Sequence, residues 1–206
     1  MTKTWFITGT SRGLGREFAR AALERGDRVA ATARDVSTLD DLVAQYGEDA
    51  VLALSLDVTD KNAVGKAVAT AHEKLGRLDV VVNNAGYGLF GMVEEITEAQ
   101  LRDQLETNLF GAFFVTEAVL PILRAQGTGH LVQISTVGGV IAYPSLGGYH
   151  ASKWPSKASP RRCPRSSPAP ASTSPSSSPA ASRPTGPGPR RATPNPTPST
   201  TTSARP

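Results

Sequence analysis

The amino-acid composition of the chain changes abruptly after Trp154, and this change limits which part of the chain can fold. From Pro155 to Pro206 the sequence contains no Val, Ile, Leu, Met, Phe, Trp, Tyr, Asp or Glu, and this segment holds 14 of the 16 prolines. A segment without large apolar side chains cannot bury enough surface to offset the conformational entropy lost on folding. We therefore expect one folded unit in residues 1–154 and a Pro/Ser/Thr/Arg-rich, disordered tail in residues 155–206.

The two parts also differ in charge. The whole chain carries a formal net charge of +4, but residues 1–154 contain 14 basic and 18 acidic residues, whereas the tail contains eight basic residues and no acidic one. The overall basic character therefore describes the tail, and it predicts no nucleic-acid partner for the folded part.

Other sequence features bear on the compartment. The single cysteine, Cys163, rules out an internal disulfide framework and fits a reducing environment. Met1–Lys3 leads directly into the strand-like Trp5–Ile7 without the apolar region of a signal peptide, and no apolar run approaches the roughly 20 residues of a membrane span. We expect a cytoplasmic protein without a membrane partner. The three histidines show no metal-ligand spacing, so no metal site is expected.

Apolar runs of strand length alternate with helix-length segments throughout residues 1–154. The strand-like runs are continuous, as in Val80–Val82, which is typical of strands buried on both faces. The expected strands are Thr4–Thr8, Arg28–Ala33, Val51–Leu56, Leu78–Asn83 and His130–Ser135. The expected helices are Leu14–Arg25, Leu39–Tyr46, Lys61–Leu75 and Glu98–Ala125. This alternation predicts a doubly wound α/β fold around a parallel sheet, with any ligand at the carboxyl ends of the strands.

A glycine-rich loop, Thr8–Gly15, lies between the first expected strand and the first expected helix. Glycines there allow a tight turn and a close approach of the backbone to a pyrophosphate, and the helix N-terminus offers N–H donors. The loop alone could be an ordinary turn, but its placement favours dinucleotide binding. The loop residues expected at the cofactor are Gly9, Ser11, Arg12, Gly13, Leu14 and Gly15.

The end of the second expected strand bears on which dinucleotide is bound. A site specific for NAD would place an acidic residue near Ala33, but Arg34 follows it here and Arg12 lies in the glycine loop. Two guanidiniums suit a 2′-phosphate, so we predict NADP as the cofactor, with NAD as the alternative. The competing interpretation is that both arginines are solvated surface residues.

Two further segments follow expected strands. Asn84, Ala85 and Gly86 follow the fourth strand, and Asp57 and Val58 follow the third. The first segment alone is an ordinary Asn/Gly-rich turn, and Asp57 is equally well explained as an N-cap or turn residue. In a dinucleotide-binding sheet, both segments would contact the cofactor, with Asp57 and Val58 beside the adenine.

Three residues near the end of the folded part form a candidate acid/base site. Ser135 ends the fifth expected strand, and Tyr149 and Lys153 lie four residues apart, on one face of a helix. A tyrosine with a reference pKa of about 10 is a poor acid/base at neutral pH, but a nearby ammonium lowers that pKa. The Ser135 hydroxyl can then hold a substrate oxygen. Each residue alone also has a structural interpretation, whereas the three together favour catalysis.

Taken together, these motifs give residues 1–154 a resemblance to the classical short-chain dehydrogenase/reductase family. The motifs, in the family's order and spacing, are Thr8-Gly9-x-x-x-Gly13-x-Gly15, Asn83-Asn84-Ala85-Gly86, Asn108 within Thr107–Gly111, Ser135 and Tyr149-x-x-x-Lys153. The resemblance implies that Tyr149 is the proton donor/acceptor and that Lys153 also binds the nicotinamide ribose. It further implies that Ser135 orients a small-molecule alcohol or carbonyl, that Asn108 positions a water, and that intact members are often homo-oligomers.

The resemblance also bears on the tail. The family continues the helix that holds Tyr149 for several turns, whereas Pro155 ends it here. Codons exist for Pro155–Ser167 that read ALEGFSEALSQEL, an amphipathic helix, once a single G is restored before them. With the same single-base shift, codons for Ser178–Pro189 can be chosen that read EPGGFATDWAGP, which resembles the family's Pro-Gly loop. We interpret the tail as an out-of-frame translation; the alternative is a genuine basic linker or polyanion-binding arm.

The sequence thus predicts a Rossmann-like doubly wound parallel sheet, truncated after the fifth strand and the start of the catalytic helix. The predicted function is NADP-preferring interconversion of an alcohol and a carbonyl, and the alternative is a non-catalytic dinucleotide-binding or regulatory remnant. Because the sheet would lack its sixth and seventh strands, the chain as written is not expected to be a working enzyme. Structure beyond about residue 156 is expected to be irregular and poorly packed. The sequence identifies no particular substrate.

Overall fold

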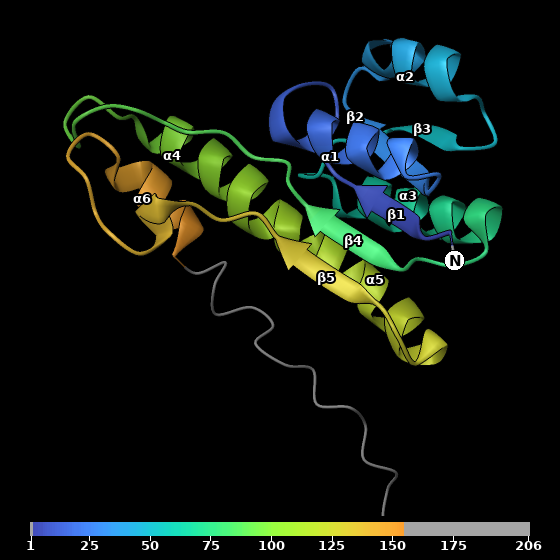
Figure 1. Cartoon of the computed structure of the whole chain (residues 1–206). Helices are drawn as coiled ribbons and strands as arrows, with labels where there is room; N and C mark the ends of the chain where they lie inside the picture. Colours follow the sequence, from blue (N-terminus) through green and yellow to red (C-terminus); the bar gives the residue numbers. More distant parts are fainter. Residues whose placement is uncertain (1, 155–206) are drawn as a thin grey trace, which may run out of the picture. The chain divides into compact units, whose positions relative to one another are not determined.

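Five parallel strands form one sheet in the order β3-β2-β1-β4-β5 (Figure 1). The computed structural model describes residues 2–154, so the expectations for the tail lie outside the described residues. The strands are β1 (Thr4–Ile7), β2 (Arg28–Ala33), β3 (Val51–Ser55), β4 (Val80–Asn83) and β5 (His130–Gln133). The strand order reverses direction between β1 and β4, which is where a doubly wound sheet binds its ligand. The predicted fold class is confirmed.

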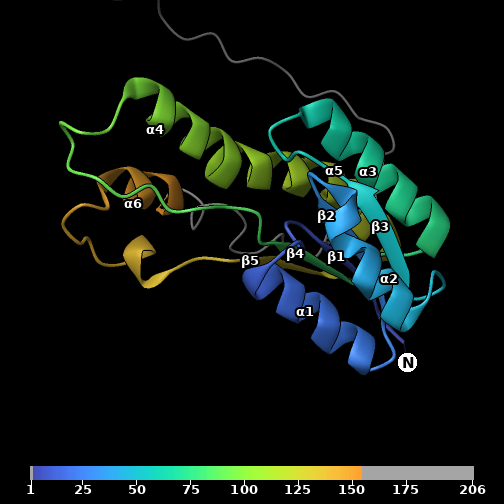
Figure 2. The same cartoon turned by 90° about the horizontal axis from the view of Figure 1, so that it is seen from above.

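Helices cover both faces of the sheet (Figure 2). The helices are α1 (Gly13–Glu24), α2 (Asp40–Tyr46), α3 (Lys61–Leu75), α4 (Glu98–Leu105), α5 (Ala112–Gln126) and α6 (Gly147–Lys153), with 3₁₀ turns at Val36–Leu39 and Val137–Gly139. Helices α1 and α2 pack on the face that carries Ile7 and Val82. Helices α3 and α5 pack on the opposite face, which carries Phe6 and Val81. This double coverage explains why the strands are continuous apolar runs.

The predicted strand Leu78–Asn83 begins two residues later than expected, at Val80. Leu78 is fully buried, but its N–H donates to Oε1 of Gln126 at 2.9 Å and its carbonyl accepts from Nε2 of Gln126 at 2.8 Å. A side-chain amide therefore takes the place of a neighbouring strand, and Leu78 packs in the core outside the ladder. Three other predicted strands end one or two residues beyond the observed ends.

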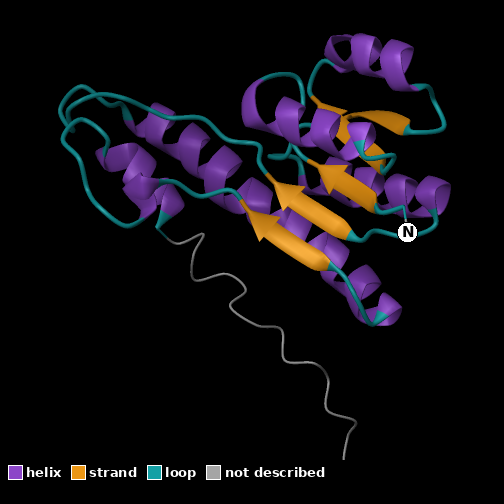
Figure 3. Cartoon of the chain, in the orientation of Figure 1, coloured by secondary structure: helices purple, strands orange, loops and turns teal. Residues whose placement is uncertain are grey.

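The predicted helix Glu98–Ala125 forms one helical run (Figure 3), which consists of α4, a π-helical segment and α5. It begins with a capping box at Thr97, and a π-helical segment, Glu106–Gly111, joins α4 to α5. Asn108 and Gly111 in the π-helical segment are both buried. Gly111 allows close packing on the loop after β3, because a Cβ there would lie 2.7 Å from Cγ2 of Val58.

The same run corrects the expectation that no apolar segment approaches the length of a membrane span. Glu98–Gln126 spans 29 residues and contains a stretch with a mean hydropathy of 1.3, so by length and composition alone it could cross a membrane. Val115 and Val119 on its inner side are fully buried and pack in the same core as α3. The core helix of an α/β protein passes the same test, so we assign no membrane role to this run.

Long loops leave the carboxyl ends of β4 and β5 and carry α4 and α6 (Figure 1). The two loops contact each other, since the N–H of Gly91 donates to the carbonyl of Ser145 at 2.9 Å. Helix α6 is tied to the second loop, because Nε1 of Trp154 donates to the carbonyl of Gly138 at 3.0 Å. These contacts bring α6 to the end of the sheet where a ligand is expected.

Candidate dinucleotide-binding and active site

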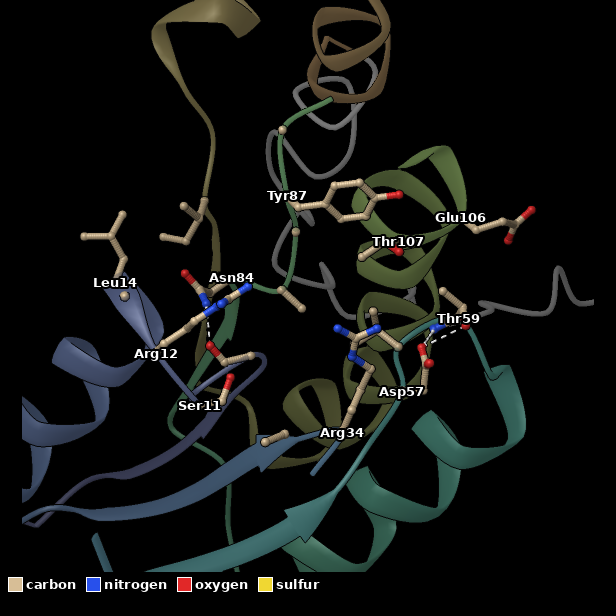
Figure 4. A pocket seen from close by; sticks show the side chains of 18 of the residues that line it. Ser11, Arg12, Leu14, Arg34, Asp57, Thr59, Asn84, Tyr87, Glu106 and Thr107 are labelled. Carbon is tan, nitrogen blue, oxygen red and sulfur yellow. Dashed lines mark hydrogen bonds between the residues drawn. The ribbon is translucent and has the colours of Figure 1, made fainter. Parts of the chain in front are cut away.

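A cleft of about 1150 Å³ lies at the carboxyl ends of the strands (Figure 4). Two of the sequence-predicted site residues, Gly15 and Asn108, do not line this cleft. The predicted residues that line it are Gly9, Ser11, Arg12, Gly13, Leu14, Arg34, Asp57, Val58, Asn84, Ala85, Gly86, Ser135, Tyr149 and Lys153. Segments that are far apart in the sequence therefore meet in one cavity, which is large enough for an extended ligand.

The glycine loop has the shape that its residue types predict. Gly9 and Gly13 have φ angles of 72° and 64°, which L-residues with a side chain rarely adopt. Gly15 is buried, and a Cβ on it would lie 2.3 Å from both the carbonyl oxygen of Gly9 and Nδ2 of Asn84. Gly15 is therefore needed for close packing of α1 against the loop, and its predicted contact with a cofactor stays a prediction.

Asn84 holds the glycine loop in place. Its Nδ2 donates to the carbonyls of Thr8 at 2.9 Å and Gly9 at 3.0 Å. The hydroxyl of Thr8 accepts the N–H groups of Asn84 and Ala85, each at 3.0 Å, and donates to the carbonyl of Val82 at 3.3 Å. The segment after β4 thus forms one hydrogen-bonded unit with the loop after β1.

Arg12 and Arg34 both line the cleft with exposed side chains (Figure 4). Within residues 2–154 the structure records no ion pair for either guanidinium. Asp35 is the acidic residue next to Arg34, but its carboxylate accepts the N–H of Ser37 at 3.1 Å and the Ser37 hydroxyl at 2.7 Å. The carboxylate thus caps a 3₁₀ turn and forms no ion pair with Arg34.

The segment after β3 supports the turn interpretation of Asp57. Its Oδ1 accepts the N–H of Thr59 at 3.0 Å and the Thr59 hydroxyl at 2.8 Å, as the dashed lines in Figure 4 show. Val58 is buried and packs against Gly111. Both residues line the cleft, so an adenine contact remains open to Val58 and to the Asp57 backbone.

Helix α6 brings Tyr149 and Lys153 to the cleft beside Ser135. Lys153 is 7% exposed, and its Nζ donates to the carbonyl of Ile134, the residue before Ser135, at 3.2 Å. Burial lowers the pKa of the Lys153 ammonium below its ordinary value. Gly86 makes room for Asn108 and for this group, since a Cβ there would lie 2.8 Å from Oδ1 of Asn108 and 3.3 Å from Nζ of Lys153. Ser135 itself is exposed, and a substrate could reach it.

Asn108 is a buried link between the loop after β4 and the helix that carries Tyr149. Its Oδ1 accepts the N–H of Tyr87 at 3.0 Å, and its Nδ2 donates to the carbonyl of Tyr87 at 2.8 Å and to Oγ of Ser152 at 2.9 Å. The Ser152 hydroxyl in turn donates to the carbonyl of Tyr149 at 2.7 Å. Both amide hydrogens of Asn108 are thus used in positioning. Its predicted contact with a water stays a prediction.

Three residues around this link were not predicted from the sequence. Gln104 is fully buried and its Nε2 donates to the carbonyl of Tyr87 at 3.0 Å, so two side-chain amides hold one backbone group. Tyr87 lines the cleft, and Ser152 connects Asn108 to α6. The four-residue spacing of Gln104 and Asn108 on one helix was a signal that could have indicated a shared polar face.

Comparison with known proteins agrees with this geometry. The sequence profile of the short chain dehydrogenase family matches residues 3–158. Oxidoreductase BOA17 of Botryotinia fuckeliana (strain B05.10) is 52% identical over 154 residues, which cover 75% of this chain and 56% of the relative. The chain spans about half the length of the first curated relatives that it matches, at 56%, 51% and 50%.

Solved structures of similar sequence have the same fold. A short-chain dehydrogenase from Streptomyces avermitilis is 44% identical with a TM-score of 0.72, over 74% of this chain and 56% of that one. An alcohol dehydrogenase from the archaeon Thermococcus sibiricus, complexed with 5-hydroxy-NADP, is 33% identical with a TM-score of 0.72, over 77% of this chain and 68% of that one.

Proposed function

This chain belongs to the short-chain dehydrogenase family, and on that premise we propose that it represents an NADP-preferring oxidoreductase that interconverts an alcohol and a carbonyl. One observation carries the proposal: Ser135, Tyr149 and Lys153 line the same cleft as the glycine loop. Proton-transfer residues and a dinucleotide-binding loop in one cavity are what a nicotinamide-dependent reaction requires. The proposed compartment is the cytoplasm, and the proposed substrate is a small molecule.

The residues of the cleft fit a dinucleotide. Gly9 and Gly13 leave the backbone open where α1 begins, so the first N–H groups of α1 can receive a pyrophosphate. Ala85, Gly86 and Val58 would lie along the nucleoside, and Lys153 would hold the nicotinamide ribose. A bound nicotinamide would accept or supply the hydride.

The proton chemistry would fall to the side chains of the chain itself. We assign to Tyr149 the hydroxyl that gives a proton to the carbonyl oxygen during reduction and takes it back during oxidation. The Ser135 hydroxyl would hold that oxygen, and Asn108 would keep α6 in position through Ser152. The Lys153 cation, desolvated and held beside Ser135, stabilises negative charge developing on the tyrosine oxygen.

The preference for NADP rests on Arg12 and Arg34. Both guanidiniums are exposed at the cleft, and the neighbouring Asp35 carboxylate is engaged with Ser37. Two guanidiniums can form charge-assisted hydrogen bonds to a 2′-phosphate, whereas a free carboxylate would favour the ribose hydroxyls of NAD. The NADP-type ligand of the Thermococcus sibiricus relative agrees with this assignment.

A second candidate function is dinucleotide binding without turnover. It is favoured by the observation that the chain spans about half the length of its curated relatives. We further propose that residues 155–206 are an out-of-frame translation and that residues 1–154 are the genuine domain. Resequencing the DNA at the Trp154 codon tests this proposal directly. The protein encoded with one G restored at that codon is called the frame-restored protein below.

The experiment that tests the proposed function compares binding with turnover. In the frame-restored protein, Tyr149→Phe should reduce carbonyl reduction below a few per cent of the wild-type rate and leave NADPH affinity nearly unchanged. Lys153→Ala should impair both, because the ammonium serves the cofactor and the tyrosine. A Tyr149→Phe protein that keeps more activity than this would reject Tyr149 as the acid/base. NADPH binding without any turnover in the wild type would favour the second candidate.

A further inference from the structure

Arg16 is a buried cation that no part of the proposed reaction uses. It lies on α1 directly after Gly15 and is 9% exposed. Arginine is rarely buried to this extent unless its guanidinium is paired. One of its nitrogens, Nη1, donates to the carbonyl of Thr38 at 2.9 Å, and Nη2 forms an ion pair with the carboxylate of Asp41. The hydrogen bond from Arg16 lowers the pKa of the Asp41 carboxyl.

Arg16 contacts both the connection from β2 to α2, at Thr38, and the first turn of α2, at Asp41. The connection begins at Arg34. This connection is ordered by its own contacts as well: the Asp35 carboxylate caps Ser37, and the Thr38 hydroxyl donates to the carbonyl of Asp35 at 2.6 Å. It is therefore a compact unit, and the Arg16 guanidinium joins that unit to the N-terminal half of α1.

The glycine loop and α1 contact the end of β2 and this connection at two points that have the same separation in sequence. The hydroxyl and the N–H of Thr10 donate to the carbonyl of Thr32 at 3.0 Å and 2.9 Å, and Arg16 donates to the carbonyl of Thr38. Both contacts join residues that are 22 positions apart. Arg12 and Arg34 have the same offset and lie between these two contacts in each segment. The two contacts therefore bracket the pair of guanidiniums.

We infer that Arg16 is a positioning residue for cofactor selectivity: it fixes the spacing between the Arg12 and Arg34 guanidiniums that would grip the 2′-phosphate. The inference rests on the proposed NADP preference. Two forked donors hold one phosphate only if both reach it together, so a shift of the β2–α2 connection would weaken NADP binding. NAD lacks the phosphate, so its binding should be affected much less.

The test measures NADPH and NADH dissociation constants by calorimetry on the full-length chain and, in parallel, on the frame-restored protein. Arg16→Met removes both contacts and should lower the NADPH/NADH preference about tenfold, the equivalent of one charge-assisted hydrogen bond. Arg16→Lys keeps the charge but cannot span Thr38 and Asp41 together, and should give an intermediate loss. Asp41→Asn should give a smaller loss, because the Thr38 contact remains.

Arg20→Met is the matched control. It removes the same type of side chain from the same helix, where Arg20 pairs with Glu17 at 3.9 Å and not with the β2–α2 connection. Its NADPH/NADH preference should equal that of the wild type. An equal loss in Arg20→Met and Arg16→Met would overturn the inference, because the effect would then be one of net charge.

Other outcomes separate this inference from the proposed function. If the wild type prefers NADPH and Arg16→Met keeps that preference, the positioning role is wrong and the proposed function stands. If Arg16→Met weakens the binding of NADPH and NADH equally, Arg16 stabilises the structure and has no role in cofactor selectivity, which overturns the inference. If the wild type shows no preference, the proposed NADP selectivity fails. In that case, hydrogen exchange at the Thr38 and Leu39 amides tests whether Arg16 orders the β2–α2 connection at all. If these amides exchange no faster in Arg16→Met than in the wild type, the inference is overturned.

Discussion

The cofactor side of the sheet and the catalytic side differ in how completely the described residues enclose them. On the cofactor side, five of the six residues of β2 are buried, and α1 and α2 pack over them. On the catalytic side, none of the four residues of β5 is buried, and Val132 is 39% exposed. The loops after β4 and β5 carry large exposed apolar side chains, such as Phe90 at 74% and Val140 at 65%.

This difference separates two properties of the protein. The proposed dinucleotide binding would depend on contacts that residues 2–154 make among themselves, such as the Asn84 amide on the glycine loop. The proposed turnover would depend on α6 and the loops around it, whose apolar side chains are largely uncovered within the described residues. We therefore expect substitutions on the two sides to change different measurements.

The largest expected effect concerns the catalytic side as a whole. The chain as written should aggregate or unfold without cooperativity and show no carbonyl reduction, because β5 is an edge strand among the described residues and the apolar loops beside it are exposed, and both features favour association. The frame-restored protein should be soluble and active. Calorimetric melting and NADPH oxidation with a panel of carbonyl compounds measure both properties. A soluble, cooperatively melting and active chain as written would break the comparison and make the tail a real part of the protein.

The next effect concerns the cofactor side. Gly15→Ala places a Cβ against the Gly9 carbonyl and the Asn84 amide, so it should destabilise the frame-restored protein by about 1–3 kcal/mol and weaken NADPH binding. Gly65→Ala in α3 is the control, since a Cβ there meets no atom within 4 Å. It should stabilise the protein by about 0.5–1 kcal/mol through helix propensity. Urea unfolding measures both; similar changes in the two variants would contradict the packing role of Gly15.

Arg34→Ala tests the cofactor side alone, by comparing the binding of NADPH with that of NADH. Loss of a charge-assisted hydrogen bond to the 2′-phosphate should weaken NADPH binding by about 1–3 kcal/mol, with NADH binding and protein stability nearly unchanged. Fluorescence titration of both cofactors measures the difference. Equal weakening of NADPH and NADH, or tighter NADH binding by the wild type, would remove the basis for NADP selectivity.

The smallest expected effect is a pH-dependent gain in stability for Lys153→Met. Burial lowers the folded-state pKa of Lys153, so the unfolded state binds its proton more tightly and stability rises with pH until the ammonium is lost in both states. Replacing Lys153 by methionine removes this cost. The gain over the wild type should be largest near neutral pH and shrink towards pH values above the ordinary pKa of 10.5. Urea unfolding across this range checks the sign; a gain that grows with pH would contradict it.

The fold could be predicted from the sequence because burial on two faces leaves continuous apolar runs such as Val80–Val82. Most predicted site residues also line the cleft, because a parallel sheet brings the carboxyl ends of its strands together. Gly15 and Asn108 do not line the cleft. Gly15 allows α1 to pack on the glycine loop, and Asn108 holds the backbone of Tyr87. Motif spacing alone does not distinguish such packing and positioning residues from residues that contact a ligand. For Gln104 the spacing to Asn108 indicates at most a shared polar face, because its partner is a backbone carbonyl, which has no sequence signal. Arg16 was not predicted because its partners, the Thr38 carbonyl and the Asp41 carboxylate, lie on another segment of the chain.

The hydrogen bonds between the glycine loop and the segment after β4 have a consequence for the order of folding. They join residues 75 to 77 positions apart, so the glycine loop cannot take its final shape when β1, α1 and β2 first come together. Contacts of such long sequence separation form late, after the intervening chain has been closed into a loop. During synthesis, the glycine loop therefore takes its final shape only once β4 and Asn84 have left the ribosome, although the loop itself was made much earlier.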